Sequence, residues 1–324
     1  MKRILIIAAV LCLMGGVIYA QTRRAANYPR VINVSYVESP FNLQIMVMKE
    51  RRMLETAFAA SGVEVRWHNI NSGADQTQAM AAGSLDIASV INSTSVILAN
   101  AAGNTVEIAA LVSRPRQSFA LMVGPNGPRS VRELRGKTVA GPKGTVLHQM
   151  LAAALAREGM SMTELNFIQM GLPEARTALL AGRVDGALQA ASLIIRNEEA
   201  GMRTLFTADG YLAPLLFTAV RPAFAKAYPE LLEIYLDIQK AVYNWIAANT
   251  KEAVAIGSRV QQISAEDGMK LFQWSGIALT MEAADTKAVE ADISFLYQQG
   301  MIDQKPNPRR FIRSTAYGKR AYGK

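Results

Sequence analysis

Two short polar segments combine small hydroxyl and amide side chains at places where helices are expected to begin. They are Asn92-Ser-Thr-Ser95 and Lys143-Gly-Thr145. Such side chains bind some of the free N–H groups at a helix start and leave others unbonded. Together with the positive end of the helix dipole, the unbonded groups attract anions. We therefore expect a carboxylate, sulfonate or related group to bind here; helix capping alone is the alternative for each residue taken singly.

Other loops at the same predicted edge of the fold supply further candidates. Phe41, Leu193 and Tyr211 are candidates for apolar or stacking walls, and His148 lies one turn into its predicted helix, from where it can reach a cleft. Ordinary packing is the alternative for each of these four. The full set of predicted ligand-binding residues is Ser39, Phe41, Asn42, Ser72, Gly73, Asn92, Ser93, Thr94, Lys143, Gly144, Thr145, His148, Gln189, Ser192 and Tyr211.

Enzyme chemistry has little support in the sequence. His68 and His148 are the only histidines, they fall in different predicted lobes, and neither has a metal-spaced partner. No Gly-x-Ser-x-Gly elbow is present, and Gly141-Pro-Lys-Gly-Thr145 lacks the spacing of a P-loop. We expect a protein that is not an enzyme and that uses no cofactor and no metal.

The elements that must position these residues alternate between short β-branched runs and longer alanine-rich helical patterns, which predicts an α/β fold with mostly parallel sheets. One series is predicted as strands 31–37, 64–70, 85–91 and 106–112 with helices 43–60, 74–82 and 94–102. A second series is predicted as strands 137–141, 164–170, 184–190 and 202–207 with helices 145–158, 173–181 and 192–200.

The two series resemble each other most closely in the segments 79–88 and 178–187, where alanines, a glycine and an aspartate match in register. Gly83 and Gly182 are each expected to end a helix in the left-handed conformation. Asp86 and Asp185 are expected to start the next buried strand and to bind backbone groups of the tight turn between the helix and that strand. A helix–glycine–strand joint is common in any α/β protein, so this echo supports two lobes without proving them.

Two apolar runs, 119–123 and 212–220, are predicted as paired strands that cross between the lobes. Two crossings form a hinge, which permits closure around a ligand. The expected lobe 1 spans 31–116 and 218–310, including C-terminal helices that begin with a long amphipathic one from Tyr228 to about Asn249; lobe 2 spans 117–217.

The two ends of the chain differ from this pattern. Lys2 and Arg3 precede an apolar run from Ile4 to Ile18, which predicts a signal peptide over 1–20, cleaved to release a periplasmic protein; an uncleaved anchor is the alternative. Cys12, the only cysteine, lies inside that run. Residues 311–324 form a basic tail, for which we expect a solvated extension that binds no nucleic acid.

Residues 31–249 resemble the periplasmic substrate-binding proteins of nitrate, taurine and aliphatic-sulfonate ABC importers. The likeness is carried by the segments 71–76, 82–87, 130–139, 141–145 and 221–232, in that order and spacing. The resemblance implies a type II periplasmic-binding fold with a two-strand hinge, a ligand between the lobes, and a membrane permease with its ATPase as partners. The ligand that we expect from the helix starts is a small anionic organic solute (sulfonate-, carboxylate- or nitrate-like). Sulfonate-binding members often carry an aromatic residue, a glutamate and a proline where Gln189-Ala-Ala-Ser-Leu193 stands here, so the ligand is not specified.

The expected function is therefore capture of a solute for an ABC importer by a monomer that meets the membrane only through the permease. Two alternatives share the fold: a sensory module that presents its closed form to a receptor, and binding or synthesis of a thiamin pyrimidine precursor.

Overall fold

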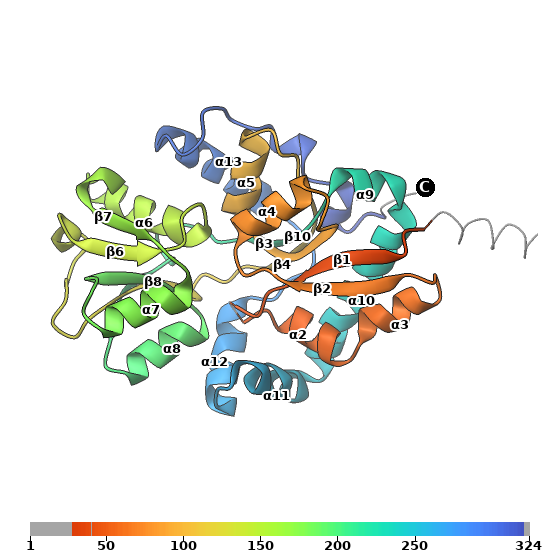
Figure 1. The fold of residues 1–324 in the computed structure, drawn as a ribbon, viewed down its shortest axis with the longest axis horizontal. Coiled ribbons are helices and arrows are strands. Elements are labelled where there is room, and N and C mark those ends of the chain that lie inside the picture. The colour runs from red at the N-terminus through yellow and green to blue at the C-terminus, as the bar shows by residue number, and fades with distance from the viewer. Residues whose placement is uncertain (1–27, 40, 321–324) are drawn as a thin grey trace, which may run out of the picture.

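The computed structural model describes residues 28–39 and 41–320. Their strands form two separate five-stranded sheets, in the orders β2-β1-β3-β10-β4 and β7-β6-β8-β5-β9. Helices flank both sheets, and the two halves lie side by side as lobes (Figure 1). The predicted α/β class is confirmed. The predicted signal peptide lies outside the described residues, and within them no helix is long and apolar enough to cross a membrane.

Lobe 1 takes four strands from the first part of the chain and one from much later. The strands are β1 (Val31–Tyr36), β2 (Glu64–Asn69), β3 (Ile87–Asn92), β4 (Glu107–Ser113) and β10 (Leu216–Val220). Strand β1 is parallel to β2 and β3, whereas β10 runs antiparallel between β3 and β4. The helices between the strands are α2 (Leu43–Glu50), α3 (Met53–Ala59), α4 (Gly73–Ala81) and α5 (Ser93–Ala101).

Lobe 2 repeats this plan. Its strands are β5 (Phe119–Val123), β6 (Thr138–Gly141), β7 (Asn166–Gln169), β8 (Gly186–Ala190) and β9 (Arg203–Thr207). Strand β6 is parallel to β7 and β8, and β5 runs antiparallel between β8 and β9. The main helices are α6 (Val146–Arg157), α7 (Leu172–Leu180) and α8 (Ser192–Glu199), with short 3-10 helices at η1 (Arg132–Leu134) and η2 (Met162–Glu164).

The matched glycines and aspartates have matched roles in the two lobes. Gly83 and Gly182 follow α4 and α7 with φ angles of 76° and 66°, so the predicted left-handed helix ends are confirmed. The Asp86 carboxylate accepts a hydrogen bond from the Asn33 N–H, and that of Asp185 accepts one from the Thr138 N–H, each at 2.9 Å. The aspartates therefore bind the neighbouring parallel strand, and not their own turn as predicted.

The helix predicted over 43–60 is two helices. Arg52, between α2 and α3, has a φ of 51°, which only a few per cent of non-glycine residues adopt. No glycine or proline marks the break in the sequence. The break lets α2 and α3 both contact α10, and α2 also packs on α11.

The crossing segments are organised differently from the prediction of paired strands. Strand β5 belongs to the lobe 2 sheet and β10 to the lobe 1 sheet, so the two do not pair with each other. Each is the antiparallel member of its own sheet, because a chain that has just crossed enters the new lobe against the direction of its neighbours. The connections themselves are the short stretches 114–118 and 208–215.

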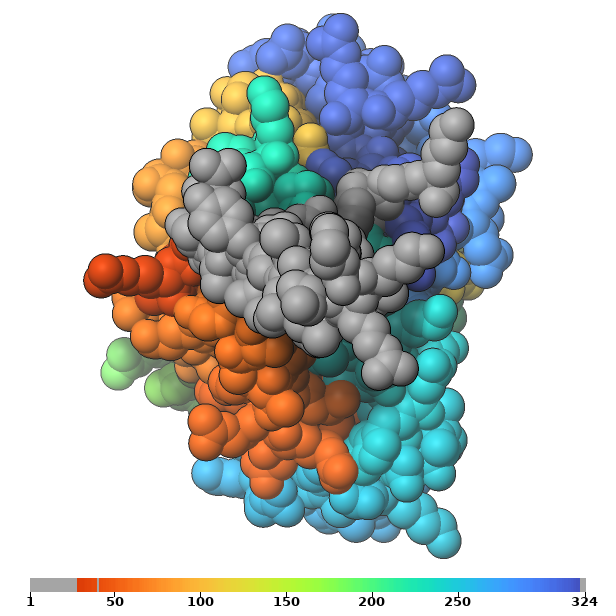
Figure 2. All heavy atoms as spheres, turned by 90° about the vertical axis from the view of Figure 1, so that its right-hand side faces the viewer, coloured from red at the N-terminus to blue at the C-terminus, as the bar shows by residue number. Residues whose placement is uncertain are grey.

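After β10 the chain is helical and wraps lobe 1. The helices are α9 (Pro222–Ala227), α10 (Pro229–Ala248), α11 (Thr250–Gln261), α12 (Ala265–Ser275) and α13 (Ala283–Gln298). Helices α10 and α11 pack on α2, α13 packs on α5, and α12 reaches α8 of lobe 2. Figure 2 shows early and late segments sharing one face of lobe 1, in orange and in cyan to blue.

The prediction of a solvated tail from residue 311 is wrong for residues 311–316, most of which are buried or half-buried, whereas residues 317–320 are exposed. Phe311 is only 2% exposed, and Ile312 forms a parallel bridge with Ile108 of β4. Thr315 donates a hydrogen bond to the Ala109 carbonyl at 2.7 Å, and Arg313 forms an ion pair with Glu107. Two short 3-10 helices, η3 (Pro308–Arg310) and η4 (Ser314–Tyr317), complete this edge. The basic composition of the tail thus gave no sign that residues 311–316 pack along β4 through apolar contacts and hydrogen bonds.

Candidate functional site

A cavity of about 440 Å³ lies between the lobes, beyond the carboxyl ends of their parallel strands. Ligands gather at such edges of open α/β sheets because loops there lead into helix N-termini. In lobe 1 the cavity is lined by residues 37–39, 71–73, 75, 76, 90–92 and 216. In lobe 2 it is lined by residues 119, 142, 145–147, 171–174, 190 and 193.

The lobe 1 wall contains the N-termini of α4 and α5, both capped by side chains. Ser72 accepts a hydrogen bond from the Asp75 N–H at 3.4 Å, and Asn92 Oδ1 accepts one from the Ser95 N–H at 2.9 Å. With Oδ1 used in capping, Asn92 Nδ2 has no acceptor among the described residues. It is therefore a donor available to a ligand.

Gly73 is required where these two helix starts meet. A Cβ atom at residue 73 would lie 2.5 Å from Ser95 Oγ and 2.8 Å from Asn92 Nδ2. Both distances are shorter than real Cβ contacts. The close approach of α4 to α5 therefore depends on the missing side chain.

The lobe 2 wall contains the N-terminus of α6, which no side chain caps. The Thr145 hydroxyl donates to the Pro142 carbonyl at 2.9 Å instead of binding the helix. In the described part of the chain no acceptor binds the backbone N–H groups of Val146 and Leu147, which line the cavity. This helix start can supply two N–H donors and a positive dipole end to an anion.

Most of the rest of the lining is apolar or acidic, with Ser39, Asn71 and Gln76 as further uncharged polar residues. Val37, Val90, Phe119, Leu193 and Leu216 provide the apolar surface. Three carboxylates, from Glu38, Asp75 and Glu174, are also part of the lining, which contains no Lys, Arg or His. Anion binding in this cavity would therefore depend on amide donors and helix dipoles, without a cationic side chain.

Five of the predicted ligand-binding residues line the cavity: Ser39, Ser72, Gly73, Asn92 and Thr145. The other ten do not, and they fall into two groups.

The first group lies directly behind the cavity wall. Ser93 and Thr94 are buried and hydrogen-bonded to Asp292 and Gln149. The Gly144 carbonyl accepts a bond from Ser95 Oγ at 3.1 Å. Asn42 Nδ2 donates to the Val37 carbonyl at 2.9 Å.

Two more residues of this first group lie at the end of β8. Gln189 is fully buried and its Nε2 donates to the Leu172 carbonyl at 3.0 Å. Ser192, the first residue of α8, is also buried. These side chains position the lining residues instead of belonging to the wall.

The second group lies away from the cavity. The Phe41 ring is buried in the lobe 1 core, where it leaves no room for a Cβ at Gly257 of α11. Tyr211 packs on Phe206, with ring centroids 5.2 Å apart. The side chain of Lys143 is exposed outside the lining, while its backbone N–H donates to Gln169.

His148 also turns away from the cavity. It packs on Phe167 of β7, with ring centroids 5.0 Å apart. Burial, and secondarily the charge of Lys143, lowers its pKa from 6.5 to about 4. Its buried Nδ1 has no partner within the described residues. It is a neutral core residue of lobe 2.

Several lining residues were not among the predicted ones, chiefly Phe119, Val146, Leu147 and the start of α7. Phe119 carried a usable signal, because it is the first residue of a predicted crossing strand. Val146 and Leu147 carried no such signal. They contribute backbone N–H groups, and these groups are free only because the Thr145 hydroxyl does not cap the helix.

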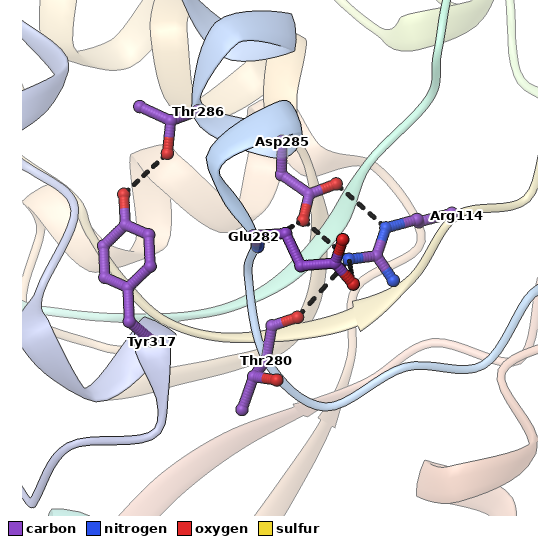
Figure 3. Close-up of polar contacts among 6 residues, drawn as sticks. All are labelled: Arg114, Thr280, Glu282, Asp285, Thr286 and Tyr317. Carbon is purple, nitrogen blue, oxygen red and sulfur yellow. Dashed lines mark hydrogen bonds and ion pairs between the residues drawn. The ribbon is translucent and has the colours of Figure 1, made fainter.

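The connection between β4 and β5 is held firmly to lobe 1. Arg114 binds Asp285, at the start of α13, through two hydrogen bonds of 2.9 and 2.6 Å, and also reaches the Thr280 carbonyl at 3.4 Å (Figure 3). Tyr317 and Thr286 share a hydrogen bond of 2.7 Å beside them. The Arg114 end of the first crossing is therefore fixed on lobe 1.

The lobes contact each other on both sides of the cleft. On the α5 side Gln149 of α6 binds Thr94 and Asp292. On the α11 side Arg196 of α8 donates to the Gln261 carbonyl at 2.6 Å, and Gln261 Nε2 donates to the Glu38 carbonyl at 2.7 Å. The second contact reaches Glu38, a residue of the cavity wall, through Gln261.

Within the described residues no group of three or more His, Cys, Asp or Glu side chains could hold a metal ion. A second hollow of about 350 Å³ lies on lobe 1 between α10 and residues 315–320, where the chain continues toward residues outside the described part. The interlobe cavity is the site at which the strand ends of both lobes converge.

Two sheets with the same plan, joined by two crossings and facing each other across this cavity, define a type II periplasmic-binding-protein fold. The chain belongs to the NMT1/THI5-like family, whose sequence profile matches residues 58–253. The predicted fold and family are confirmed.

Its relatives include proteins named for sulfonates. A putative aliphatic sulfonates-binding protein of Bacillus subtilis is 26% identical over 275 residues, which cover 84% of this chain and 82% of that one. The taurine-binding periplasmic protein of Escherichia coli is 28% identical over 179 residues, or 54% and 55% of the two chains.

Solved structures with the same fold include the alkanesulfonate-binding protein SsuA from Xanthomonas axonopodis pv. citri bound to MOPS, with a TM-score of 0.79, 18% identity and coverage of 88% of this chain and 98% of that one. SsuA from Escherichia coli has a TM-score of 0.72 and 17% identity, with coverage of 89% and 93%.

Proposed function

We propose that this chain is an extracytoplasmic solute-binding protein that captures a small organic sulfonate, or a closely related organic anion, between its lobes. The observation that carries the proposal is the pair of unused donor sets facing one cavity, Asn92 Nδ2 from lobe 1 and the Val146 and Leu147 N–H groups from lobe 2. A sulfonate has three oxygens, which suits donors converging from two sides. The apolar part of the lining suits a short aliphatic chain.

The names of the relatives support the same ligand class, because two of them bind aliphatic sulfonates or taurine by name. The absence of Lys and Arg from the lining does not oppose an anion, since amide donors and helix N-termini stabilise negative charge where water is excluded.

The biological setting follows from this class. We infer that the protein is exported by the N-terminal signal, acts in the periplasm as a monomer, and delivers its solute to a membrane permease driven by an ATPase. Under this proposal the chain catalyses no reaction and needs no cofactor, and its work consists of closing on the solute and docking.

Isothermal titration with ethanesulfonate tests the proposal, with ethyl methyl sulfone as the uncharged molecule of similar shape. The expected result is one ethanesulfonate per chain and no measurable binding of the sulfone. Equal binding of both compounds, or binding of neither ethanesulfonate nor other small organic anions, would overturn the proposal.

Asn92→Asp makes the test specific to the site. Aspartate caps a helix as well as asparagine, so α5 stays capped, but the Nδ2 donor is replaced by an anionic oxygen. We expect ethanesulfonate affinity to fall at least 100-fold, because a like charge and a lost charge-assisted hydrogen bond each cost on the order of 1.5–3 kcal/mol. Asn307→Asp, at the cap of η3, is the matched control and should bind normally.

A further inference from the structure

Gln149 is a lobe 2 side chain whose two polar ends both bind lobe 1. It belongs to α6, and its Oε1 accepts a hydrogen bond from Thr94 Oγ1 of α5. Its Nε2 donates to Asp292 Oδ1 of α13 at 2.6 Å. Asp292 Oδ2 in turn accepts from Ser93 Oγ at 3.0 Å. One amide therefore binds two residues of the opposite lobe directly and a third through Asp292, and all four side chains are buried.

This network stands directly behind the ligand cavity. Thr94 is two residues beyond Asn92, and Gln149 is four residues beyond Thr145, and both Asn92 and Thr145 line the cavity. A hinge motion that separated these two helix starts would pull Gln149 away from Thr94 and Asp292. The Asp292 carboxylate, now 9% exposed, would then meet water.

Asp292 has no cation to offset its burial. Burial raises its pKa from 3.8 to about 6, against the opposing effect of the hydrogen bonds from Gln149 and Ser93. Helix α5 carries no ionisable side chain, α6 carries His148 and Arg157, and η3 carries the exposed Arg309 and Arg310. None of these, nor any charged neighbour on α13, contributes to the pKa of Asp292.

We propose that Gln149 and Asp292 form an interlobe latch that holds the closed form and thereby sets ligand affinity without contacting the ligand. The inference rests on the proposed function, because it assigns these residues to the closure that capture requires. Gln149 and Asp292 are positioning residues. A closed form that needs a buried carboxylate is more stable when that carboxylate is protonated.

The direction of the pH effect follows from linkage. The pKa of Asp292 is raised in the closed form and returns toward its ordinary value when the lobes separate, so the closed form binds more protons. Closure is therefore favoured as the pH falls through about 6, and this gain is lost as the pH rises. Between pH 7.5 and pH 5 the expected gain in ligand affinity is about tenfold, since each pKa unit corresponds to a factor of ten.

The test measures ethanesulfonate binding at pH 7.5 and pH 5, because a sulfonate does not titrate in this range. The wild-type protein should bind about tenfold more tightly at pH 5. Asp292→Asn keeps the shape and the acceptor for Gln149 Nε2, with the bond to Ser93 reversed, but it cannot ionise, so its affinity should not depend on pH. Gln149→Leu should bind about tenfold more weakly than wild type at pH 7.5, where it leaves an ionised carboxylate without its partner.

Gln239→Leu is the matched control for loss of a buried amide. Gln239 also binds at both ends, to Thr218 Oγ1 at 2.9 Å and to the Leu111 carbonyl at 3.1 Å, but all three residues belong to lobe 1. It should lower the free energy of unfolding and leave the wild-type pH dependence of binding intact. A wild-type pH dependence in Asp292→Asn, or unchanged affinity in Gln149→Leu, would overturn the latch.

Small-angle scattering of the ligand-free protein separates the latch from the proposed ligand. If no variant binds ethanesulfonate at either pH, the proposed function fails, while the scattering still tests the latch. A smaller radius of gyration at pH 5 than at pH 7.5, with Asp292→Asn equally compact at both, supports it. A radius that does not depend on pH in the wild-type protein contradicts it.

Discussion

At the scale of single residues, Gly73 is the position where helix packing and ligand binding both depend on the absence of a Cβ atom. A Cβ there meets Ser95 Oγ and Asn92 Nδ2 at less than 3 Å. We expect Gly73→Ala to displace Asn92, to weaken ethanesulfonate binding about tenfold, and to cost about 1–3 kcal/mol of stability through overpacking. Titration calorimetry and urea unfolding measure the two effects. Gly124→Ala, where a Cβ meets nothing within 4 Å, should change neither.

A second residue, His148, makes the free energy of unfolding depend on pH. Its pKa is lowered to about 4 in the fold but is near 6.5 in the unfolded chain, so the unfolded state binds more protons in between. The contribution of neutral His148 to stability is therefore complete above pH 6.5 and is lost as the pH falls toward 4. Between pH 7 and pH 4.5 the wild-type protein should lose about 2 kcal/mol more than His148→Gln in urea unfolding. Equal losses would show that the buried ring is not the cause.

At the scale of elements, the first turn of α6 is the part assigned to the anion. Val146→Pro removes one of its two free N–H donors while proline is well accommodated at the first position of a helix. We expect a roughly tenfold loss of ethanesulfonate affinity with the fold retained, a value of the size expected for one charge-assisted hydrogen bond. Ala265→Pro, at the exposed first position of α12, is the control. Unchanged binding in Val146→Pro would remove α6 from the site.

The connection held by Arg114 and Asp285 is the element on which hinge bending depends. Burial alone would raise the pKa of Asp285, but hydrogen bonds from Arg114 and the Glu282 N–H, with the Arg114 charge, lower it. Its contribution to stability is thus present at neutral pH and lost as the pH falls below the ordinary carboxyl range.

Asp285→Asn should cost about 2–3 kcal/mol in urea unfolding at pH 7, because the partly buried Arg114 then keeps only the exposed Glu282 carboxylate, 3.6 Å away, as a counter-charge. The difference from wild type should shrink at pH 3. Glu252→Gln, in the exposed pair with Arg51, should cost less than about 0.5 kcal/mol. A comparable loss in both variants would mean that the Arg114 pair has no special role in the connection.

At the scale of the whole molecule, the sequence predicted the features that depend on local chemistry. Gly83 and Gly182 predict the ends of their helices from residue type alone. The alternation of apolar and alanine-rich runs predicts two α/β series. Features decided by tertiary packing were missed. The left-handed Arg52 has no local signal, the tail at Phe311 looks polar by composition, and the pairing of β5 and β10 depends on where the other strands already lie.

The same distinction explains the site predictions. Ser72, Asn92 and Thr145 were predicted because small polar residues mark helix starts at the strand ends, and all three line the cavity. Phe41 and Tyr211 were misplaced because an aromatic side chain in a loop can turn toward a core as readily as toward a cleft. Val146 and Leu147, which carry the free N–H groups of α6, were not predicted, because every residue type except proline has a backbone N–H group and the residue type therefore does not mark it.

The measurement that tests the central claim most directly is native mass spectrometry of the freshly purified protein, before and after incubation with small sulfonates and carboxylates. The account predicts one small organic anion bound per chain, retained by Asn307→Asp and lost in Asn92→Asp. A ligand-free mass under all conditions, or a neutral ligand that Asn92→Asp retains, would contradict it.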